Sequence, residues 1–335
     1  MAYWFLMLLV AAAKLASVGG FRLIKAAGPQ RQLILGERGV IRDLASIYHI
    51  ERNEPHPKTI DAVRKHCNTW NVYLDNHSVA PHTVEAFGEA CNFVRSFYNS
   101  TPSSSLKREV ILDSGCGKGK STRALAREFP SMPVIGIDRS VARLSHTNLY
   151  RKSDYGSDDN IGDDDEGDED VDVGNKDDMM ARPPNLLLVR AELADFWLLV
   201  AVQSDWYVHK HYLLYPNPYP KLKHLQRRWH GHPIFPAFLA LGGEVVVRSN
   251  WKIYLEEMEM CMRFVHERNG ECAAPKLGGG SVQLCNFTEY ALDSPDEAIT
   301  HFERKYVAAR SPLYELRAHW GERAPEDRLR ALGLL

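Results

Sequence analysis

Three glycines at alternate positions, Gly115, Gly117 and Gly119, form a loop directly after the apolar run EVILD, which ends in Asp113. The run predicts a short strand, and the segment STRALAREF after the loop predicts a helix. Glycines in this place allow the backbone to approach a ligand, and the helix N-terminus offers free N–H groups to it. The loop therefore indicates a site for a phosphate-bearing or nucleotide-like ligand.

The spacing of the glycines separates three known patterns. A Walker A loop, GxxxxGK[ST], would need its first glycine at the position of Ser114. The dinucleotide pattern GxGxxG would need its third glycine at the position of Lys120. The GxGxG pattern fits all three glycines, and in this the loop resembles that of class I S-adenosylmethionine methyltransferases. The resemblance implies that the glycines make room for the methionine part of the cofactor and that Asp113 faces its ammonium group.

Two further acids stand where the next two predicted strands end. Asp138 ends the run PVIGID, 25 residues after Asp113, and Glu192 ends the run NLLLVRAE. In doubly wound sheets an acid at the first position accepts hydrogen bonds from ribose hydroxyls. An acid at the second position is placed to reach an adenine amino group. Each acid alone is compatible with a helix cap or a solvated loop, but the three together favour a cofactor site at the mouth of the sheet.

The elements that must position these residues alternate between strand and helix from residue 108 onward. Apolar runs of strand length are separated by helical patterns such as VARLSHTNLY and ADFWLLVAVQ. Repeated β-α-β units predict an α/β fold with a parallel, doubly wound sheet covered by helices on both faces.

The fourth predicted strand continues into the segment LLYPNPYPKLKHLQRRWHGHPIFPAFL. This segment is similar to the FPDPWPKxxHxKRR segment of the tRNA (guanine-N7-)-methyltransferases. Further matches are DSGCGKGKST, GIDRS, RSNWKIYLEEM and ITHFERKY, and together they span residues 109–316 apart from an acidic insertion. The resemblance implies a Rossmann-like, mostly parallel seven-stranded sheet, S-adenosylmethionine as the cofactor and methyl transfer to N7 of a guanine in tRNA.

The resemblance also implies roles for individual residues. The cofactor would be bound by Asp113, Gly115, Gly117, Gly119, Asp138, Glu192 and Asn217, and Asn217 would also lie near the methyl-transfer path. The target guanosine would be contacted by Lys221, Asn250, Thr300, His301, Phe302 and Glu303.

Three of these positions depart from the family pattern. Asn217 and Asn250 stand where the family has aspartates, and His301 stands where it has a lysine. The departures predict a divergent branch, slow or assisted by a partner subunit. Two alternatives stay open: a catalytically weak protein that binds RNA or S-adenosylmethionine, and an amino-group methyltransferase of the adenine-N6 kind, although the order NPYP does not match that motif.

The window after Asn217 suits RNA on physical grounds as well. Basic and aromatic side chains crowd it: Tyr219, Lys221, Lys223, His224, Arg227, Arg228, Trp229, His230 and His232. Bases interleaved with aromatics suit phosphate contact and base stacking, so Arg227 and Arg228 are predicted RNA contacts. The five histidines within residues 209–232 lack the spacing of metal ligands, and no metal is expected.

Composition sets the limits within which these motifs act. The chain has 335 residues, of which 44% are apolar and 25% charged, and these values exclude collagen-like, fully disordered and polytopic membrane proteins. Six scattered cysteines without a CxxC pair favour small buried side chains over disulfides or zinc. Residues 154–178 carry a net charge of −12, so the rest of the chain carries +10, which suits a polyanionic partner.

These patterns predict four parts of the chain. Residues 1–29 are a possible targeting segment, residues 30–105 a helical N-terminal region, residues 106–320 the methyltransferase domain and residues 321–335 a tail. The acidic insertion at 153–184 is expected to be disordered. The apolar run at residues 2–13 is too short to span a membrane, and import into an organelle, a plastid or mitochondrion, is slightly favoured over a cytoplasmic location.

Two helices are predicted within the N-terminal region. The first would be capped by Thr59 and would bury Ile60 and Val63. The second, at residues 84–98, would place Val84, Phe87, Cys91, Val94 and Tyr98 on one face.

Overall fold

The computed structural model of the chain describes residues 54–100, 107–145, 182–203, 205–267, 288–332 and 334, together with four short strands outside these ranges. Most of the predicted targeting segment and most of the predicted acidic insertion lie outside the described residues. Both therefore stay predictions. No helix in the described part of the chain is long and apolar enough to cross a membrane.

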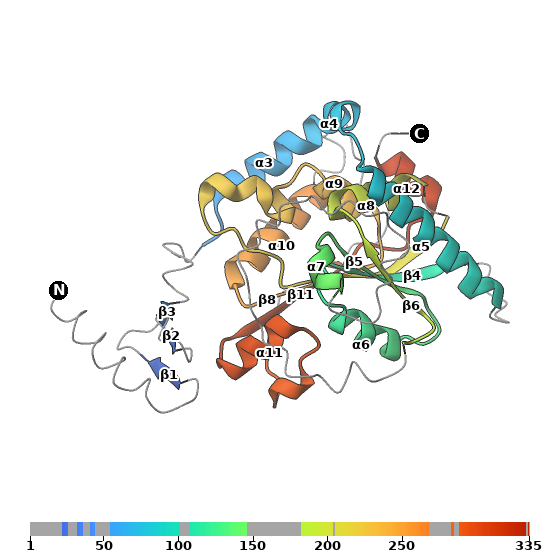
Figure 1. Ribbon diagram of the computed structural model, residues 1–335. Helices are drawn as coiled ribbons and strands as arrows, with labels where there is room; N and C mark the ends of the chain where they lie inside the picture. Colours follow the sequence, from blue (N-terminus) through green and yellow to red (C-terminus); the bar gives the residue numbers. More distant parts are fainter. Residues whose placement is uncertain are drawn as a thin grey trace.

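One large mixed sheet forms the centre of the molecule (Figure 1). Seven strands follow one path in the order β10-β11-β8-β7-β4-β5-β6, and a two-residue strand, β9, pairs with β11 outside that path. The strands are β4 (Glu109–Ser114), β5 (Val134–Asp138), β6 (Leu186–Arg190), β7 (Tyr207–Leu214), β8 (Glu244–Ser249), β9 (Gln283–Leu284), β10 (Thr288–Tyr290) and β11 (Leu313–His319).

Strands β4 to β8 pair in parallel, whereas β11 pairs antiparallel with β8 and with β10. The predicted α/β class with a mostly parallel seven-stranded sheet is confirmed.

Helices cover both faces of this sheet. One face is covered by α3 (Pro57–Asn68), α4 (Trp70–Asn76), α5 (Pro81–Ser100), α8 (Leu193–Gln203), α9 (Phe235–Ala240), α10 (Lys252–Glu267) and α12 (Pro325–Ala331). The other is covered by α6 (Lys120–Glu128), α7 (Val141–Ser145) and α11 (His301–Ala308). Three short 3-10 helices, η3 (Leu222–Arg227), η4 (Trp229–Gly231) and η5 (Pro295–Glu297), lie in the connections.

The central strands are apolar almost throughout because both of their faces are covered. Every residue of β5 is buried, and all but one in each of β4 and β6. On the larger side of the core the Trp197 ring packs against the rings of Trp229 and Phe238, with centroids 4.6 and 5.0 Å away. The cysteines that the structure describes, Cys67, Cys91, Cys116 and Cys261, are buried and are not joined in disulfides.

The N-terminal helices differ from the predictions in detail. Helix α3 begins at Pro57, because proline suits the first helical position and the His56 Nδ1 atom accepts a hydrogen bond from the Lys58 N–H. Thr59 therefore lies inside the helix and is buried, so the prediction that it caps the helix was wrong. In α5, Phe87, Cys91 and Val94 are buried as predicted. Val84 is 48% exposed, so it does not belong to the buried face.

The connection between α4 and α5 is tied to the first turn of α8. The carboxylate of Asp195 accepts hydrogen bonds from the Ala80 N–H at 2.8 Å and contacts the His77 ring at 2.7 Å. The α3–α5 region is therefore bonded to the sheet domain and is no separate unit. Before it, strands β1 (Arg22–Lys25), β2 (Gln32–Leu35) and β3 (Ile41–Asp43) form a small antiparallel sheet. Two of them lie within the range predicted to be helical.

Candidate active site

The glycine loop joins β4 to α6 at the carboxyl edge of the sheet. Gly115, Gly117 and Gly119 all have positive φ angles, which side chains other than glycine rarely adopt. A methyl group added at Gly119 would lie 2.8 Å from the Leu188 Cδ1 atom, so this glycine allows close packing on β6. The same addition at Gly117 would meet nothing within 4 Å. The backbone at Gly117 is therefore open to a ligand.

Asp113 lies beneath this loop and braces the start of α6. Its side chain is 1% exposed, and its Oδ2 atom accepts hydrogen bonds from the hydroxyls of Ser121 and Thr122, both at 2.6 Å. Burial raises the pKa of this carboxyl to about 6, although the two hydroxyls act against the rise. The Asp113 carboxylate on β4 is therefore held at the glycine loop by Ser121 and Thr122, which lie in the helix that follows this loop.

Asp138 ends the neighbouring strand and fixes the loop from the other side. Its Oδ2 atom accepts a hydrogen bond from the Gly117 N–H at 2.8 Å, and its Oδ1 atom accepts one from the Ser140 N–H at 2.9 Å. Glu192 follows the next strand, and its side chain is exposed while its N–H donates to the Thr83 hydroxyl. The structure thus places the three predicted acids at the carboxyl ends of β4, β5 and β6, which are adjacent strands.

The segment after β7 leaves the same edge, because β7 pairs in parallel with β4. Tyr215 and Tyr219 have φ angles of 53° and 43°, unusual for residues other than glycine, and between them lie two prolines on either side of Asn217. Asn217 is exposed, and its Oδ1 atom accepts a hydrogen bond from the Tyr219 N–H at 3.2 Å. The backbone therefore presents this amide outward in a restrained turn.

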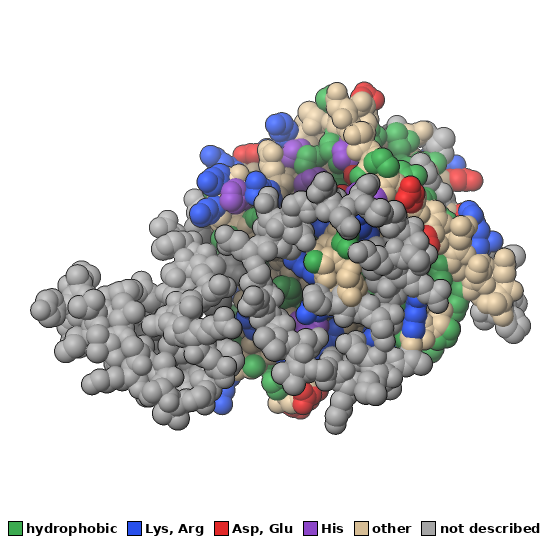
Figure 2. All heavy atoms as spheres, in the orientation of Figure 1, with side chains coloured by type: hydrophobic (Ala, Val, Ile, Leu, Met, Phe, Trp, Pro, Cys, Tyr) green, Lys and Arg blue, Asp and Glu red, His purple; other side chains and the backbone are tan. Residues whose placement is uncertain are grey.

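The next residues form a basic surface. Lys221, Lys223 and Arg227 are exposed, and the Arg227 guanidinium lies 5.9 Å from the centroid of the Tyr219 ring. Figure 2 shows Lys and Arg side chains gathered with histidine at the upper left of the view, where residues 222–231 lie in Figure 1. Cations beside an aromatic ring at one edge of the sheet suit a nucleic-acid backbone and its bases.

A family model described as "Putative methyltransferase" (Methyltransf_4) matches residues 107–316, which include the glycine loop, the three acids and the segment after β7. The chain belongs to this family, that of the tRNA (guanine-N7-)-methyltransferases. It is therefore a methyltransferase that depends on S-adenosylmethionine.

Solved structures of other methyltransferases resemble the fold. One is an antibiotic-related methyltransferase, 11% identical with a TM-score of 0.42 over 70% of this chain and 94% of that chain. The 16S rRNA methyltransferase KamB is 19% identical, with a TM-score of 0.35 over 65% and 89%. A variant of the 16S rRNA (adenine(1408)-N(1))-methyltransferase from Catenulisporales acidiphilia, crystallised with the cosubstrate SAM, is 14% identical, with a TM-score of 0.35 over 68% and 89%. No curated protein in the comparison matches this chain.

The site of this methyltransferase fits its cofactor. The open backbone at Gly117 leaves a cradle that a side chain would fill, and the carboxylates of Asp113 and Asp138, 1% and 3% exposed, are bonded to the start of α6 and to the Gly117 N–H. Hydroxyl-rich ribose and a cationic amino acid group are the chemistry that carboxylates and free N–H groups bind.

One predicted RNA contact of the methyltransferase requires a correction. Arg228 is 4% exposed, and its guanidinium donates to the carboxylate of Glu257 and to the carbonyl of Tyr219 at 3.1 Å. His230 is fully buried, and its Nε2 atom lies 3.1 Å from the same carboxylate. Arg228 therefore holds the basic segment against α10 from inside, and only Arg227 of the pair faces outward. Among the described residues, no group of His, Cys, Asp or Glu side chains is arranged to hold a metal ion.

The last predicted group lies at the start of α11. The Thr300 hydroxyl caps this helix by accepting a hydrogen bond from the Glu303 N–H at 2.9 Å. Phe302 is 44% exposed, and His301 and Asn250 are half-buried. Glu303, by contrast, is 0% exposed. Thr300, His301 and Phe302 thus remain candidates for contact with a substrate, whereas the Glu303 carboxylate is enclosed by protein.

Sequence reasoning missed a buried contact beneath the glycine loop. The Ser114 hydroxyl lies 2.8 Å from the His211 Nε2 atom and accepts a hydrogen bond from the Trp197 Nε1–H at 2.9 Å. Burial lowers the pKa of His211 to about 3, so this imidazole is neutral at physiological pH. The contact joins β4, β7 and α8 directly below the loop. No motif signals it, because its three members lie far apart in the sequence.

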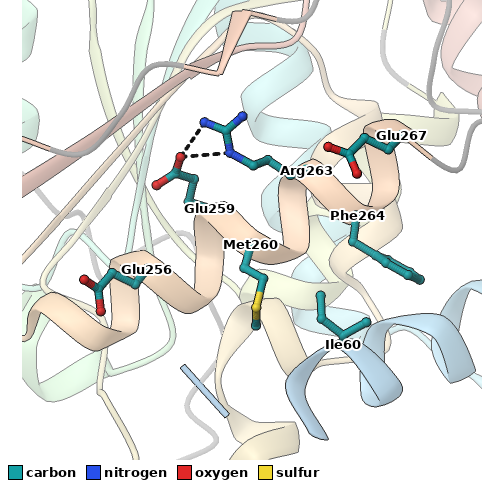
Figure 3. Close-up of a pocket in the computed structure, with 7 residues that line it drawn as sticks. All are labelled: Ile60, Glu256, Glu259, Met260, Arg263, Phe264 and Glu267. Carbon is teal, nitrogen blue, oxygen red and sulfur yellow. Dashed lines mark hydrogen bonds and ion pairs between the residues drawn. The ribbon is translucent and has the colours of Figure 1, made fainter. Parts of the chain in front are cut away.

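A separate cavity of about 420 Å³ lies between α3 and α10 (Figure 3). Its lining residues are Ile60, Glu256, Glu259, Met260, Arg263, Phe264 and Glu267, and Arg263 is paired with Glu259. None of them belongs to the glycine loop or to the segment after β7. The cavity is therefore distinct from the candidate active site.

Proposed function

We propose that this chain transfers a methyl group from S-adenosylmethionine to N7 of a guanine in tRNA. The observation that supports this most directly is the segment after β7. It leaves the carboxyl edge beside the glycine loop and exposes Asn217, Lys221 and Arg227 within one short stretch. A methyl donor bound at the loop and a polyanion bound to the segment would then meet at one edge of the sheet.

For the cofactor, the proposal assigns the methionine part to the open backbone at Gly117. Asp138 would accept hydrogen bonds from the ribose hydroxyls, and Glu192, which is exposed beyond β6, would reach the adenine. Because Asp138 also accepts from the Gly117 N–H, the ribose contact and the loop conformation would depend on one carboxylate. A cationic ammonium group near Asp113 would favour the ionised form of that carboxyl against its raised pKa.

Methyl transfer to guanine N7 requires no side chain to act as a general base. Bound S-adenosylmethionine supplies a methyl group on a positively charged sulfur. Guanine N7 already has a lone pair, so no side chain has to remove a proton before attack. The residues at the edge would instead align N7 with the methyl group, exclude water and stabilise the positive charge that appears on the purine. Asn217 would contribute to the last of these through its carbonyl dipole alone.

For the RNA, the proposal assigns phosphate contacts to Lys221 and Arg227, and stacking to aromatic side chains. Two such side chains lie near the edge: Tyr219, half-buried beside Arg227, and Phe302, exposed at the start of α11. Phosphate contacts fix the orientation of a nucleic acid, and stacking is how proteins hold an unpaired base.

The test is to incubate the full chain with tRNA and S-adenosylmethionine and to identify methylated nucleosides by mass spectrometry. We expect N7-methylguanosine. Methylation of an adenine amino group would instead support the alternative amino-group activity. Cofactor binding by calorimetry without any methylated nucleoside would support a catalytically weak binding protein.

Asn217→Asp sharpens this test. A carboxylate opposes the charge that develops on the purine better than an amide does, by an amount equivalent to about 30-fold or more in rate. We expect Asn217→Asp to raise the rate of N7-methylguanosine formation, with exposed Asn92→Asp on α5 as the control that leaves it unchanged. A slower Asn217→Asp enzyme would show that the amide itself orients the base.

A further inference from the structure

The buried carboxylate of Glu303 is the centre of a polar cluster at the edge of the sheet. Its Oε1 atom accepts hydrogen bonds from the Tyr290 hydroxyl at 2.5 Å, from the Arg248 Nη1 atom at 3.0 Å and from the Tyr215 hydroxyl at 3.2 Å. Its Oε2 atom accepts one from the Ile299 N–H at 2.7 Å. We refer to Tyr215, Arg248, Tyr290 and Glu303 as the Glu303 cluster.

These donors occupy the carboxylate. Three of the four donors reach Oε1 and one reaches Oε2, and the Tyr215 hydroxyl also lies 2.8 Å from the Tyr290 hydroxyl. The pKa values of Tyr215 and Tyr290 are raised, chiefly by burial, so both hydroxyls keep the proton that they donate. With the side chain 0% exposed, the Glu303 carboxylate has no surface with which to contact a guanine.

Three of the four members of the Glu303 cluster lie within three residues of a residue proposed to meet the substrate. Tyr215 lies two residues before Asn217, Arg248 lies two residues before Asn250, and Glu303 follows Thr300 by three residues. These three segments leave β7, leave β8 and begin α11, respectively. One buried carboxylate therefore connects the three segments on which the proposed substrate contacts lie.

The backbone strengthens the connection at Tyr215. This residue has a φ angle of 53°, in the region where side chains other than glycine are strained. Its N–H donates to the Arg248 carbonyl at 2.8 Å while its hydroxyl reaches Glu303 and Tyr290. The turn that carries Asn217 thus starts from a residue held at both its backbone and its side chain.

We propose that Glu303 is a positioning residue for methyl transfer, which sets Asn217, Asn250 and the start of α11 relative to one another through Tyr215, Arg248 and Tyr290 and does not itself contact the guanine. The inference rests on the proposed function. It assigns a part in alignment to Tyr215, Arg248 and Tyr290, to which the sequence patterns gave no individual role. It also predicts that removing the hydroxyl of Tyr215 or Tyr290, neither of which contacts the substrate in this proposal, lowers kcat more than it weakens tRNA binding.

The experiment compares Tyr215→Phe, Tyr290→Phe and Glu303→Gln in the full chain with Tyr98→Phe as the control. Tyr98 also exchanges hydrogen bonds through its hydroxyl, but with the backbone of Glu109 at the amino end of β4. The first readout is the kcat and the KM for tRNA in N7-methylguanosine formation. The second is amide hydrogen exchange over residues 215–219, 248–251 and 299–303.

A misplaced alignment can cost about 100-fold in rate, and we expect Glu303→Gln to lower kcat by about 10- to 100-fold. Tyr215→Phe and Tyr290→Phe should lower it less, with the KM for tRNA and the affinity for S-adenosylmethionine almost unchanged in all three. Amide exchange should rise in all three segments together. The control should change neither kcat nor exchange in these segments.

A raised KM for tRNA in Glu303→Gln, with both Tyr→Phe variants equal to the parent, would overturn the proposal and make Glu303 a direct contact. If Glu303→Gln does not fold, the two Tyr→Phe variants decide alone, since each removes a single oxygen. If the parent forms no N7-methylguanosine, the proposed function fails. The exchange data still decide the Glu303 cluster in that case, because exchange that rises in one segment only, or in none, would refute the connection.

Discussion

The two halves of the carboxyl edge are stabilised by different interactions. At β4 and β5, on the proposed cofactor side, the hydrogen bonds to the acids come from neutral groups, two hydroxyls for Asp113 and two backbone N–H groups for Asp138, and the exposed Arg143 guanidinium lies 3.9 Å from Asp138. At β7, β8 and α10, on the proposed substrate side, buried carboxylates are paired with arginines: Glu257 with buried Arg228, and Glu303 with Arg248, which is 18% exposed. Breaking a buried ion pair leaves an uncompensated charge, so the substrate side should be the more sensitive to single substitutions.

The largest expected effect separates two adjacent arginines on the substrate side. Arg228→Ala should lower the free energy of unfolding by about 3–5 kcal/mol, because the Glu257 carboxylate would stay buried with its arginine partner removed. Arg227→Ala should change it by about 0.5 kcal/mol or less, because the side chain is exposed. Urea denaturation of both variants measures the difference. Equal stabilities would show that the buried pair contributes nothing and that the two halves do not differ in this way.

On the cofactor side, Asp138→Ala should act on ligand binding. Losing charge-assisted hydrogen bonds costs about 1–3 kcal/mol, which is about 5- to 150-fold in the affinity for S-adenosylmethionine. The loss has two sources in the structure, the ribose contact that we propose and the Gly117 N–H that the carboxylate fixes. Calorimetry checks it, with exposed Asp296→Ala on η5 as the control. Unchanged cofactor affinity in Asp138→Ala would remove this acid from the site.

The pH dependence of stability should come mainly from buried histidine. The pKa of His211 is lowered to about 3 from the ordinary value of 6.5, so below pH 6.5 the unfolded chain takes up a proton that the folded chain refuses. The contribution of His211 is present above pH 6.5 and is lost as the pH falls toward 3. Between pH 7 and pH 5 it amounts to a loss of about 2 kcal/mol.

Other buried groups modify this slope. His232, with its pKa lowered to about 4 chiefly by burial, acts in the same direction. Asp113, with its pKa raised to about 6, acts in the opposite direction, since the folded state then binds the extra proton between pH 6 and 4.

His211→Asn should make the fall in unfolding free energy between pH 7 and 5 smaller by about 2 kcal/mol. Exposed His319→Gln should keep the parental slope, and an equal slope in His211→Asn would mean that His211 does not remain neutral.

The same division explains which parts the sequence could predict. On the cofactor side, the bonds join residues close in the chain: Asp113 with Ser121, or Asp138 with Ser140. Strand ends and loop glycines therefore place the acids at the carboxyl edge from local pattern alone, and their contact with the cofactor stays a prediction. On the proposed substrate side, the bonds join residues far apart in the chain, such as Tyr215 with Glu303. The sequence therefore indicated nine basic and aromatic residues between positions 219 and 232, but it could not show which of them are exposed and which are packed inside the protein.

Arg228 shows the limit most clearly. Its type and its neighbours favour an RNA contact, and only the position of Glu257, on a helix 29 residues away, reveals an internal ion pair. The Thr59 cap failed for a different reason. A threonine before an apolar pattern is a common helix start, but Pro57 already suits the first turn and His56 supplies the cap. The rule for helix caps therefore selected Thr59, although the correct start signal, His56 followed by Pro57, lies only two to three residues earlier.

The smallest expected effect concerns the outer face of the basic segment. Arg227 is exposed beside Tyr219, and its guanidinium is in place to meet a phosphate while the ring meets a base. Arg227→Ala should weaken tRNA binding by about 1 kcal/mol, the scale of one hydrogen bond. It should also reduce the slope of log affinity against log salt by about 1, because one phosphate contact fewer releases fewer counterions. Binding measured across a series of salt concentrations tests both numbers, and Arg330→Ala on α12, an exposed arginine paired with Asp327, is the matched control.

A variant that loses affinity with an unchanged slope would place Arg227 against a base and not a phosphate. One that loses neither would leave Lys221 and Lys223 as the cations that bind the backbone, so the substrate side would recognise tRNA at η3 without its arginine.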